Sequence, residues 1–122
     1  MTSLRGAFLG ILLFLLAACQ PGPSRVTIMD GNQAYTLTSS ETQPAKLLAK
    51  AGITLGDRDR LLYLGASIPL DASLAEANSY TLIVRRAVQV SLDAPGEVQT
   101  YATSALTVGQ ALAEKGLVLS SL

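Results

Sequence analysis

An internal repeat is the feature that most constrains the fold of this chain. Residues 44–55 (PAKLLAKAGITL) and 108–119 (VGQALAEKGLVL) lie 64 positions apart and share one pattern: a short helical segment, a glycine and an alternating apolar exit. A hairpin-like stretch with alternating polarity precedes each copy. Self-similarity at a fixed period indicates one supersecondary unit that occurs twice. The repeat therefore predicts one small fold of which the chain holds more than one copy, whole or partial.

The hairpins can be placed from side-chain alternation. Val26 and Ile28 alternate with polar residues, which predicts a half-buried strand, and residues 35–37 continue the alternation on the return strand. We expect Asp30-Gly31 to supply the positive φ angles of a tight turn. The second hairpin is expected to turn at residues 93–96 (DAPG).

The two helices are marked at both ends. Pro44 suits the first turn of a helix, where its missing N–H costs nothing. Thr107 followed by Gln110 predicts a capping box for the second helix. Gly52 and Gly116 stand where a left-handed cap ends a helix. One apolar stripe at i, i+3, i+4 and i+7 is expected to lie on the sheet: Pro44, Leu47, Leu48 and Ala51.

Shorter elements follow the first helix. The sequence predicts a polar loop at 56–60 (GDRDR), a turn at 65–69 and a single helical turn or loop at 73–79. It predicts strands at 61–64 and 80–84, the second running through residues 85–87 into Val88 without a linker. Strand, strand, helix and shorter strands form an α+β arrangement, the β-grasp that ubiquitin shares.

The chain resembles the ubiquitin-like domain of unknown function that occurs in tandem in resuscitation-promoting factors and related Gram-positive envelope proteins. The matching stretches are 26–31, 47–48, 51–55, 59–60 and 83–90. The resemblance implies one complete copy at 25–87 and the truncated first half of another at 88–122. In that family the copies act as spacers or binding modules at the cell wall, ahead of a five-glycine module and a lytic domain. No catalytic residue carries over from the resemblance.

The N-terminus predicts a lipoprotein signal peptide over residues 1–18. Residues 7–18 form an uninterrupted apolar run of twelve, shorter than the roughly 20 residues that span a bilayer. Leu16-Ala17-Ala18-Cys19 resembles the lipobox, in which the Cys19 thiol accepts a lipid. Simple cleavage and an uncleaved anchor helix are the alternatives. Residues 19–24 would form a short tether that holds the first domain near the outer face of the membrane.

Composition excludes several functions. Nine basic and nine acidic residues give zero net charge, which argues against nucleic-acid binding. Histidine is absent, which removes the commonest general base and the commonest metal ligand. Cys19 is the only cysteine, so neither an intrachain disulfide nor a metal site built from several cysteines can form. We therefore expect no catalytic residue, no metal site and no cofactor.

Several patterns allow a functional or a structural interpretation. Residues 57–60 (DRDR) could bind calcium or act as an acid pair, but alternating charges favour a solvated loop. Arg85-Arg86 could bind an anionic polymer or lipid headgroups, but neighbours on a strand point to opposite faces, which favours a solvated or strand-joining role. The tyrosines could stack on glycans or border the core: Tyr35, Tyr63, Tyr80 and Tyr101.

Three functions follow from these observations. The favoured one is a non-catalytic envelope lipoprotein, a spacer or binding domain whose partners are the membrane, through its lipid, and peptidoglycan or another envelope protein. The second is the N-terminal part of a muralytic enzyme whose catalytic domain lies beyond Leu122. The third is a chaperone-like or sensory lipoprotein that pairs with a protein on an exposed strand edge. In every case we expect the half-repeat at 88–122 to be unable to fold alone.

Overall fold

The computed structural model describes residues 22–118, so Cys19 and the predicted signal peptide lie outside the described residues. The elements are β1 (Ser24–Asp30), β2 (Gln33–Ser39), α2 (Pro44–Ala51), β3 (Arg60–Tyr63), β4 (Ala66–Ile68), β5 (Ser79–Arg85), β6 (Val88–Ala94), β7 (Glu97–Thr103) and α3 (Val108–Glu114). Within this part of the chain, no helix is long and apolar enough to cross a membrane.

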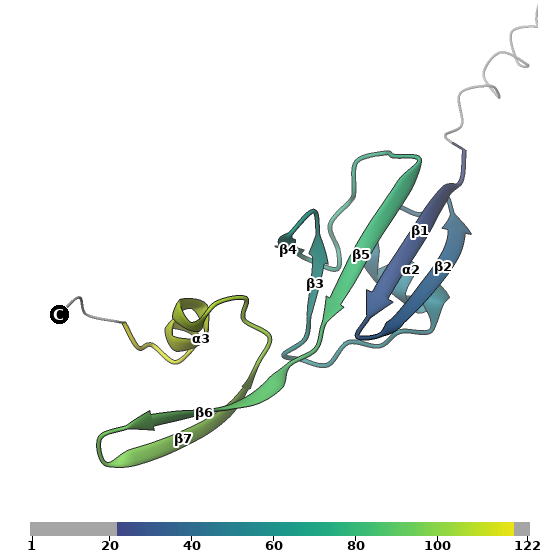
Figure 1. Ribbon diagram of the computed structural model, residues 1–122. Helices are drawn as coiled ribbons and strands as arrows, with labels where there is room; N and C mark the ends of the chain where they lie inside the picture. The colour runs from purple at the N-terminus through teal and green to yellow at the C-terminus, as the bar shows by residue number, and fades with distance from the viewer. Residues whose placement is uncertain (1–21, 119–122) are drawn as a thin grey trace, which may run out of the picture.

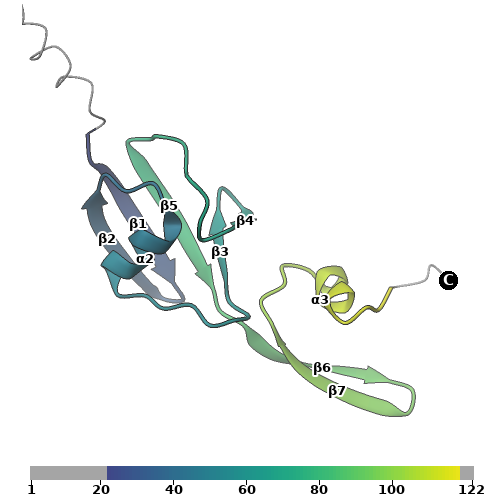
Figure 2. The same ribbon diagram turned by 180° about the vertical axis from the view of Figure 1, so that it is seen from behind.

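The first five strands form one mixed sheet. Its order is β2-β1-β5-β3-β4; β1 and β5 are parallel and all other neighbours are antiparallel. Helix α2 crosses one face of this sheet (Figure 2). A helix packed diagonally on a mixed sheet with two parallel central strands is the β-grasp arrangement, and the predicted α+β fold is confirmed.

The core lies between α2 and the sheet. The predicted stripe of α2 faces inward: Pro44, Leu47 and Leu48 are buried and Ala51 is half-buried. Alternate residues of β1 and β5 meet this stripe, since side chains of a strand point to opposite faces in turn. The buried apolar cluster consists of Val26, Ile28, Leu47, Leu48, Ile53, Leu61, Leu74, Tyr80, Leu82 and Val84.

Proline and glycine residues mark the ends of α2 and the turn of the first hairpin. Pro44 opens the helix, and Gly52 closes it in the left-handed region at φ +71°. The β1–β2 turn differs slightly from the prediction. Asp30 still pairs with Gln33, so the turn is formed by Gly31-Asn32, and only Gly31 has positive φ. A positive φ at the first turn residue alone is the type II′ pattern.

The second repeat contains a two-stranded sheet and one helix. β6 and β7 pair from Val88↔Thr103 to Ala94↔Glu97, and this hairpin extends away from the first sheet (Figure 1). The predicted cap of α3 is present: the Thr107 hydroxyl accepts a hydrogen bond from the Gln110 N–H at 3.2 Å. Among the apolar side chains described in residues 88–118, only Leu112 is buried. This repeat thus has almost no core of its own.

Two predicted boundaries were wrong. Ser24 belongs to β1 and not to the tether; it is buried, and its hydroxyl donates to the Ala77 carbonyl. The predicted turn at 65–69 contains β4, because the turn lies earlier, at Leu64-Gly65, where both residues have positive φ. The alternative of a helical turn at 73–79 is also wrong: residues 73–78 form a loop that places Leu74 in the core.

Candidate functional site

The junction between the two repeats gathers more charged contacts than any other part described. β5 ends at Arg85 and β6 begins at Val88, so only two residues separate the strands. The two neighbouring arginines point to opposite sides, as the strand geometry predicts. Arg86 turns toward the first β-grasp domain, whereas Arg85 turns toward the loop that precedes α3. Each arginine therefore joins the junction to a different partner.

Arg86 binds two carboxylates. Its guanidinium donates to both Asp30 oxygens, at 3.0 and 2.5 Å, and to Asp59 Oδ2 at 2.8 Å. It also donates to the Thr54 carbonyl at 2.7 Å. A planar guanidinium suits this fork of acceptors better than the point charge of a lysine would. These contacts connect the β1–β2 turn, the loop after α2 and the start of the second repeat.

Asp59 is the central acceptor of this cluster. Its carboxylate accepts the main-chain N–H of Ala87 at 2.8 Å and that of Gly56 at 2.9 Å, in addition to Arg86. The pKa of Asp59 is lowered, chiefly because the Ala87 N–H donates to the charged form; burial opposes this, and Gly56 and Arg86 reinforce it. The prediction of a solvated loop is therefore wrong for Asp59, whose side chain is 12% exposed.

A second set of contacts holds the other side of the junction. Arg85 donates to the carbonyls of Ser104 and Ala105 at 2.9 and 3.0 Å. Ser104 is buried, and its hydroxyl donates to the Arg58 carbonyl. Arg60 of β3 forms an ion pair with Glu114 of α3. Residues 57–60, the last of which begins β3, thus contact the second repeat and have a structural role.

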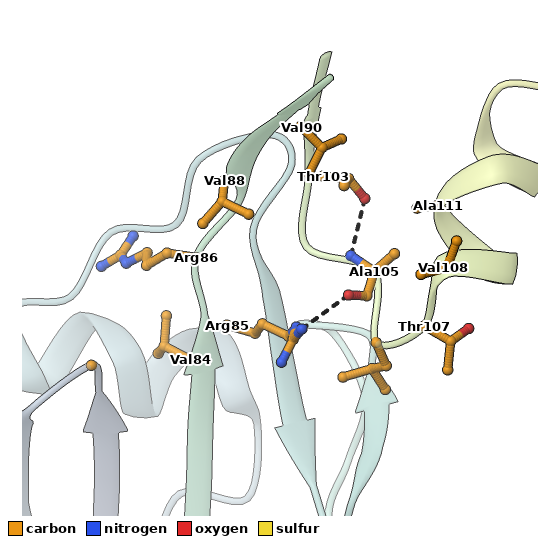
Figure 3. Close-up of a pocket in the computed structure, with 12 residues that line it drawn as sticks. Val84, Arg85, Arg86, Val88, Val90, Thr103, Ala105, Thr107, Val108 and Ala111 are labelled. Carbon is orange, nitrogen blue, oxygen red and sulfur yellow. Dashed lines mark hydrogen bonds between the residues drawn. The ribbon is translucent and has the colours of Figure 1, made fainter. Parts of the chain in front are cut away.

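An apolar groove lies beside these contacts. It has a volume of about 550 Å³ and runs between the β5–β6 strand and the start of α3 (Figure 3). Apolar side chains line most of it: Val84, Val88, Val90, Leu106, Val108 and Ala111. Arg85, Arg86 and Thr103 add polar atoms at its borders, and the Thr103 hydroxyl accepts a hydrogen bond from Ala105 N–H. The groove can hold an apolar chain but presents no reactive group.

The remaining candidate residues do not lie together in one site. Tyr80 is buried and donates to the Ala75 carbonyl, and its ring lies 6.1 Å from that of Tyr63. Tyr101 lies in the other repeat, where it donates to the Ala111 carbonyl, so the tyrosines form no common glycan-stacking surface. Ser39 is buried and accepts from Lys50 at 2.8 Å. Within residues 22–118, no group of three potential ligands could hold a metal ion.

The fold and the junction define a class: a chain of ubiquitin-like β-grasp repeats joined strand to strand. The profile of the G5-linked ubiquitin-like domain matches residues 26–62 and 88–122, more than half of the chain. The chain belongs to this family. The two matched segments also confirm the repeat that the sequence predicts.

Two known proteins are similar to the chain. Resuscitation-promoting factor Rpf2 of Corynebacterium glutamicum is 36% identical over 88 residues, which cover 72% of this chain and 21% of that protein. The chain therefore spans about a fifth of the length of this relative. The ubiquitin-like domain of an Arabidopsis thaliana protein, solved by NMR, has a TM-score of 0.43 and 19% identity, over 54% of this chain and 79% of that one.

Proposed function

We propose that the chain is a non-catalytic lipoprotein module of the bacterial cell envelope that serves as a spacer or binding domain near peptidoglycan. The similarity to a resuscitation-promoting factor and the family of G5-linked ubiquitin-like domains support a place at the cell wall. The apolar run followed by Leu16-Ala17-Ala18-Cys19 supports a lipid anchor on the outer face of a membrane.

The hydrogen-bonded junction between the two repeats is the observation that carries the spacer role. A spacer must keep its length and direction, which a flexible linker of glycine and serine does not. Here Arg86 fixes the junction to Asp30 and Asp59 on one side, and Arg85 fixes it to the loop before α3 on the other. Only Arg86 and Ala87 lie between the strands. The two repeats therefore act as one extended unit that projects from the lipid.

The absence of catalysis is part of the proposal. The sequence has no histidine, and the carboxylates at the junction are held by an arginine and main-chain N–H groups instead of being paired for proton transfer. The Ser39 hydroxyl is buried and accepts a hydrogen bond from Lys50 at 2.8 Å. The junction carboxylates and Ser39 therefore hold the fold together, and we assign the chain a binding or spacing role.

A second candidate is that the chain is part of a muralytic enzyme. The observation that favours it is the match to about a fifth of a resuscitation-promoting factor. On this hypothesis the ubiquitin-like repeats would hold a separate catalytic domain at a set distance from the membrane. The sequence of the genome immediately after Leu122 distinguishes the two candidates.

Lipid attachment to Cys19 and binding to peptidoglycan are tested by separate experiments. Cells that express the chain are labelled with an alkyne fatty acid, and Cys19→Ser is compared with the unchanged chain. Label on the chain and none on Cys19→Ser is expected; equal labelling of both would contradict the anchor. The purified chain in detergent is then sedimented with peptidoglycan sacculi. Co-sedimentation of the chain with the sacculi would support a wall-binding domain. If the chain stays in the supernatant, the spacer role is the proposed function that remains.

A further inference from the structure

The β-grasp sheet of the first repeat has two edge strands, β2 and β4, which differ in length. β4 has three residues and follows the tight turn at Leu64-Gly65, and very short edge strands resist further pairing. β2 has seven residues and pairs with β1 along its whole length. Within residues 22–118, no strand lies on the outer side of β2. All five strands of the sheet are present in this repeat, so the free edge of β2 is a property of the whole fold.

β2 lacks the features by which natural proteins usually protect an edge strand. Those features are lysine, proline, bulges and inward-pointing charges. The strand (QAYTLTS) contains no charged residue and no proline, and its register with β1 is unbroken from Gln33 to Ser39. Tyrosine and threonine, which supply three of its residues, favour strands. The edge of β2 is therefore able to accept a further strand.

The register of the hairpin shows which main-chain groups the free edge offers. Asp30 and Gln33 close the two-residue turn, and the two residues of such a closing pair exchange hydrogen bonds. Hydrogen-bonded pairs then alternate along the hairpin, so every second residue of β2 directs its N–H and C=O toward β1. The residues between them direct both groups outward and are exposed: Ala34, Thr36 and Thr38.

These outward main-chain groups are complementary to those of a second copy of β2. When two β2 strands meet antiparallel about a two-fold axis at Thr36, Thr36 lies opposite Thr36 and Ala34 lies opposite Thr38. Each of these pairs joins two residues whose N–H and C=O groups point outward, so each is a hydrogen-bonded pair. The pairing therefore satisfies all the outward main-chain groups of Ala34, Thr36 and Thr38.

The side chains of two β2 strands are complementary in the same register. Tyr35 of one copy lies opposite Leu37 of the other, in a non-hydrogen-bonded pair, where side chains approach most closely. Both residues are half-buried and pack against the core of their own copy, so the pairing extends the core across the two-fold axis. On the other face of the sheet, Thr36 lies opposite Thr36, and Thr–Thr pairs stabilise antiparallel strands.

We propose that two copies of this chain form a dimer through their β2 strands, which pair antiparallel about Thr36 and join the two β-grasp sheets into one. A second copy fits this edge better than an unrelated segment, because β2 is complementary to itself in both its main-chain groups and its side chains. The next strands of the chain lead elsewhere, since the β6–β7 hairpin extends away from this sheet (Figure 1). The proposal concerns this edge alone, so its failure would leave the proposed function untouched.

Cysteine cross-linking of the full chain in detergent micelles tests the pairing and its register. Thr36→Cys places two thiols across the two-fold axis, where the Cα atoms of a hydrogen-bonded pair lie about 5.5 Å apart, within reach of a disulfide. Thr81→Cys is the matched control, because Thr81 is an exposed threonine on the same face of the sheet. Residue 81 would lie about 24 Å from its copy, since about five strand spacings separate the two.

Mild oxidation should therefore cross-link Thr36→Cys into a dimer and leave Thr81→Cys at the level of the unchanged chain. Cys19 is present in both variants, so the comparison between them corrects for any reaction of its thiol.

A charge at the centre of β2 tests the same pairing without a cross-link. Thr36→Lys brings two like charges together across the axis and should weaken dimer formation by about tenfold or more. Thr81→Lys, on a central strand, should change it by less than about twofold. Sedimentation equilibrium, with detergent micelles in excess over the chain, measures both variants. Both positions are exposed, so circular dichroism should give both variants the melting curve of the unchanged chain, which verifies that they fold.

Three results would overturn the proposal. The first is an unchanged chain that stays monomeric at concentrations up to about 1 mM. The second is cross-linking of Thr36→Cys that does not exceed that of Thr81→Cys. The third is a dimer that Thr36→Lys weakens no more than Thr81→Lys does, which would place the interface between copies on another surface.

Discussion

Replacement of Leu48 by alanine tests whether the helix stripe is the core of the first repeat. Leu48 is 3% exposed and packs with Leu47 against the strands of the sheet. A Leu→Ala substitution at such a site lowers the free energy of unfolding by about 2–5 kcal/mol, because the transfer free energy of the removed atoms is lost and a cavity is left behind. A domain of this size is stable by roughly 3–9 kcal/mol. We therefore expect Leu48→Ala to remove a large share of the stability and to lower Tm by roughly 10–30 °C.

Circular dichroism on the chain in detergent micelles measures this change as a melting curve. Lys46→Ala is the matched control, because Lys46 lies on the same helix with a side chain that is 60% exposed and a weak ion pair to Glu41. Its loss should change the free energy of unfolding by less than about 1 kcal/mol. An unchanged Tm for Leu48→Ala, or an equal shift in both variants, would refute the position of Leu48 in the core.

Further predictions concern the second repeat and the junction. Hydrogen exchange should be faster in residues 88–118 than in the β-grasp domain, since Leu112 is the one buried apolar side chain described there; equal protection would contradict an incomplete copy. Asp59→Asn should speed exchange of the Ala87 amide, measured by NMR, while Asp57→Asn, at an exposed position, should not. Because folding lowers the pKa of Asp59, the charged carboxylate stabilises the folded chain above the ordinary pKa of 3.8, and this stabilisation is lost as the pH falls through the lowered pKa. Acid titration should therefore speed exchange of the Ala87 amide. An Ala87 amide whose exchange shows no effect of losing the Asp59 charge would count against this. A peptidoglycan gel should show no cleared band for the purified chain.

Local chemistry predicted most of the first repeat from the sequence. Alternation placed Val26 and Ile28 on a strand, and Pro44 and Gly52 marked the ends of α2, as the structure confirms. β4 was missed because its turn places Leu64 in the left-handed region, at φ +51°. Leucine rarely adopts that conformation, so no sequence pattern points to a turn there.

The junction could be predicted only in part. The alternation rule correctly placed Arg85 and Arg86 on opposite sides. Their partners could not be inferred, because Asp30 and Asp59 are 56 and 27 residues away from Arg86 in the sequence. Only the folded β-grasp brings the β1–β2 turn and the loop before β3 together. Lipidation of Cys19 stays a prediction, since that residue lies outside the described part of the chain.

The most direct test of the spacer role is the orientation of the two repeats in solution. Residual dipolar couplings are measured for amides of β1, β2 and β5 and for amides of β6 and β7 in the weakly aligned full chain. If Arg85, Arg86 and Asp59 fix the junction, one alignment tensor fits both sets in the orientation of the structure. Two tensors, with a reduced magnitude for β6 and β7, would show a flexible junction and contradict the rigid spacer.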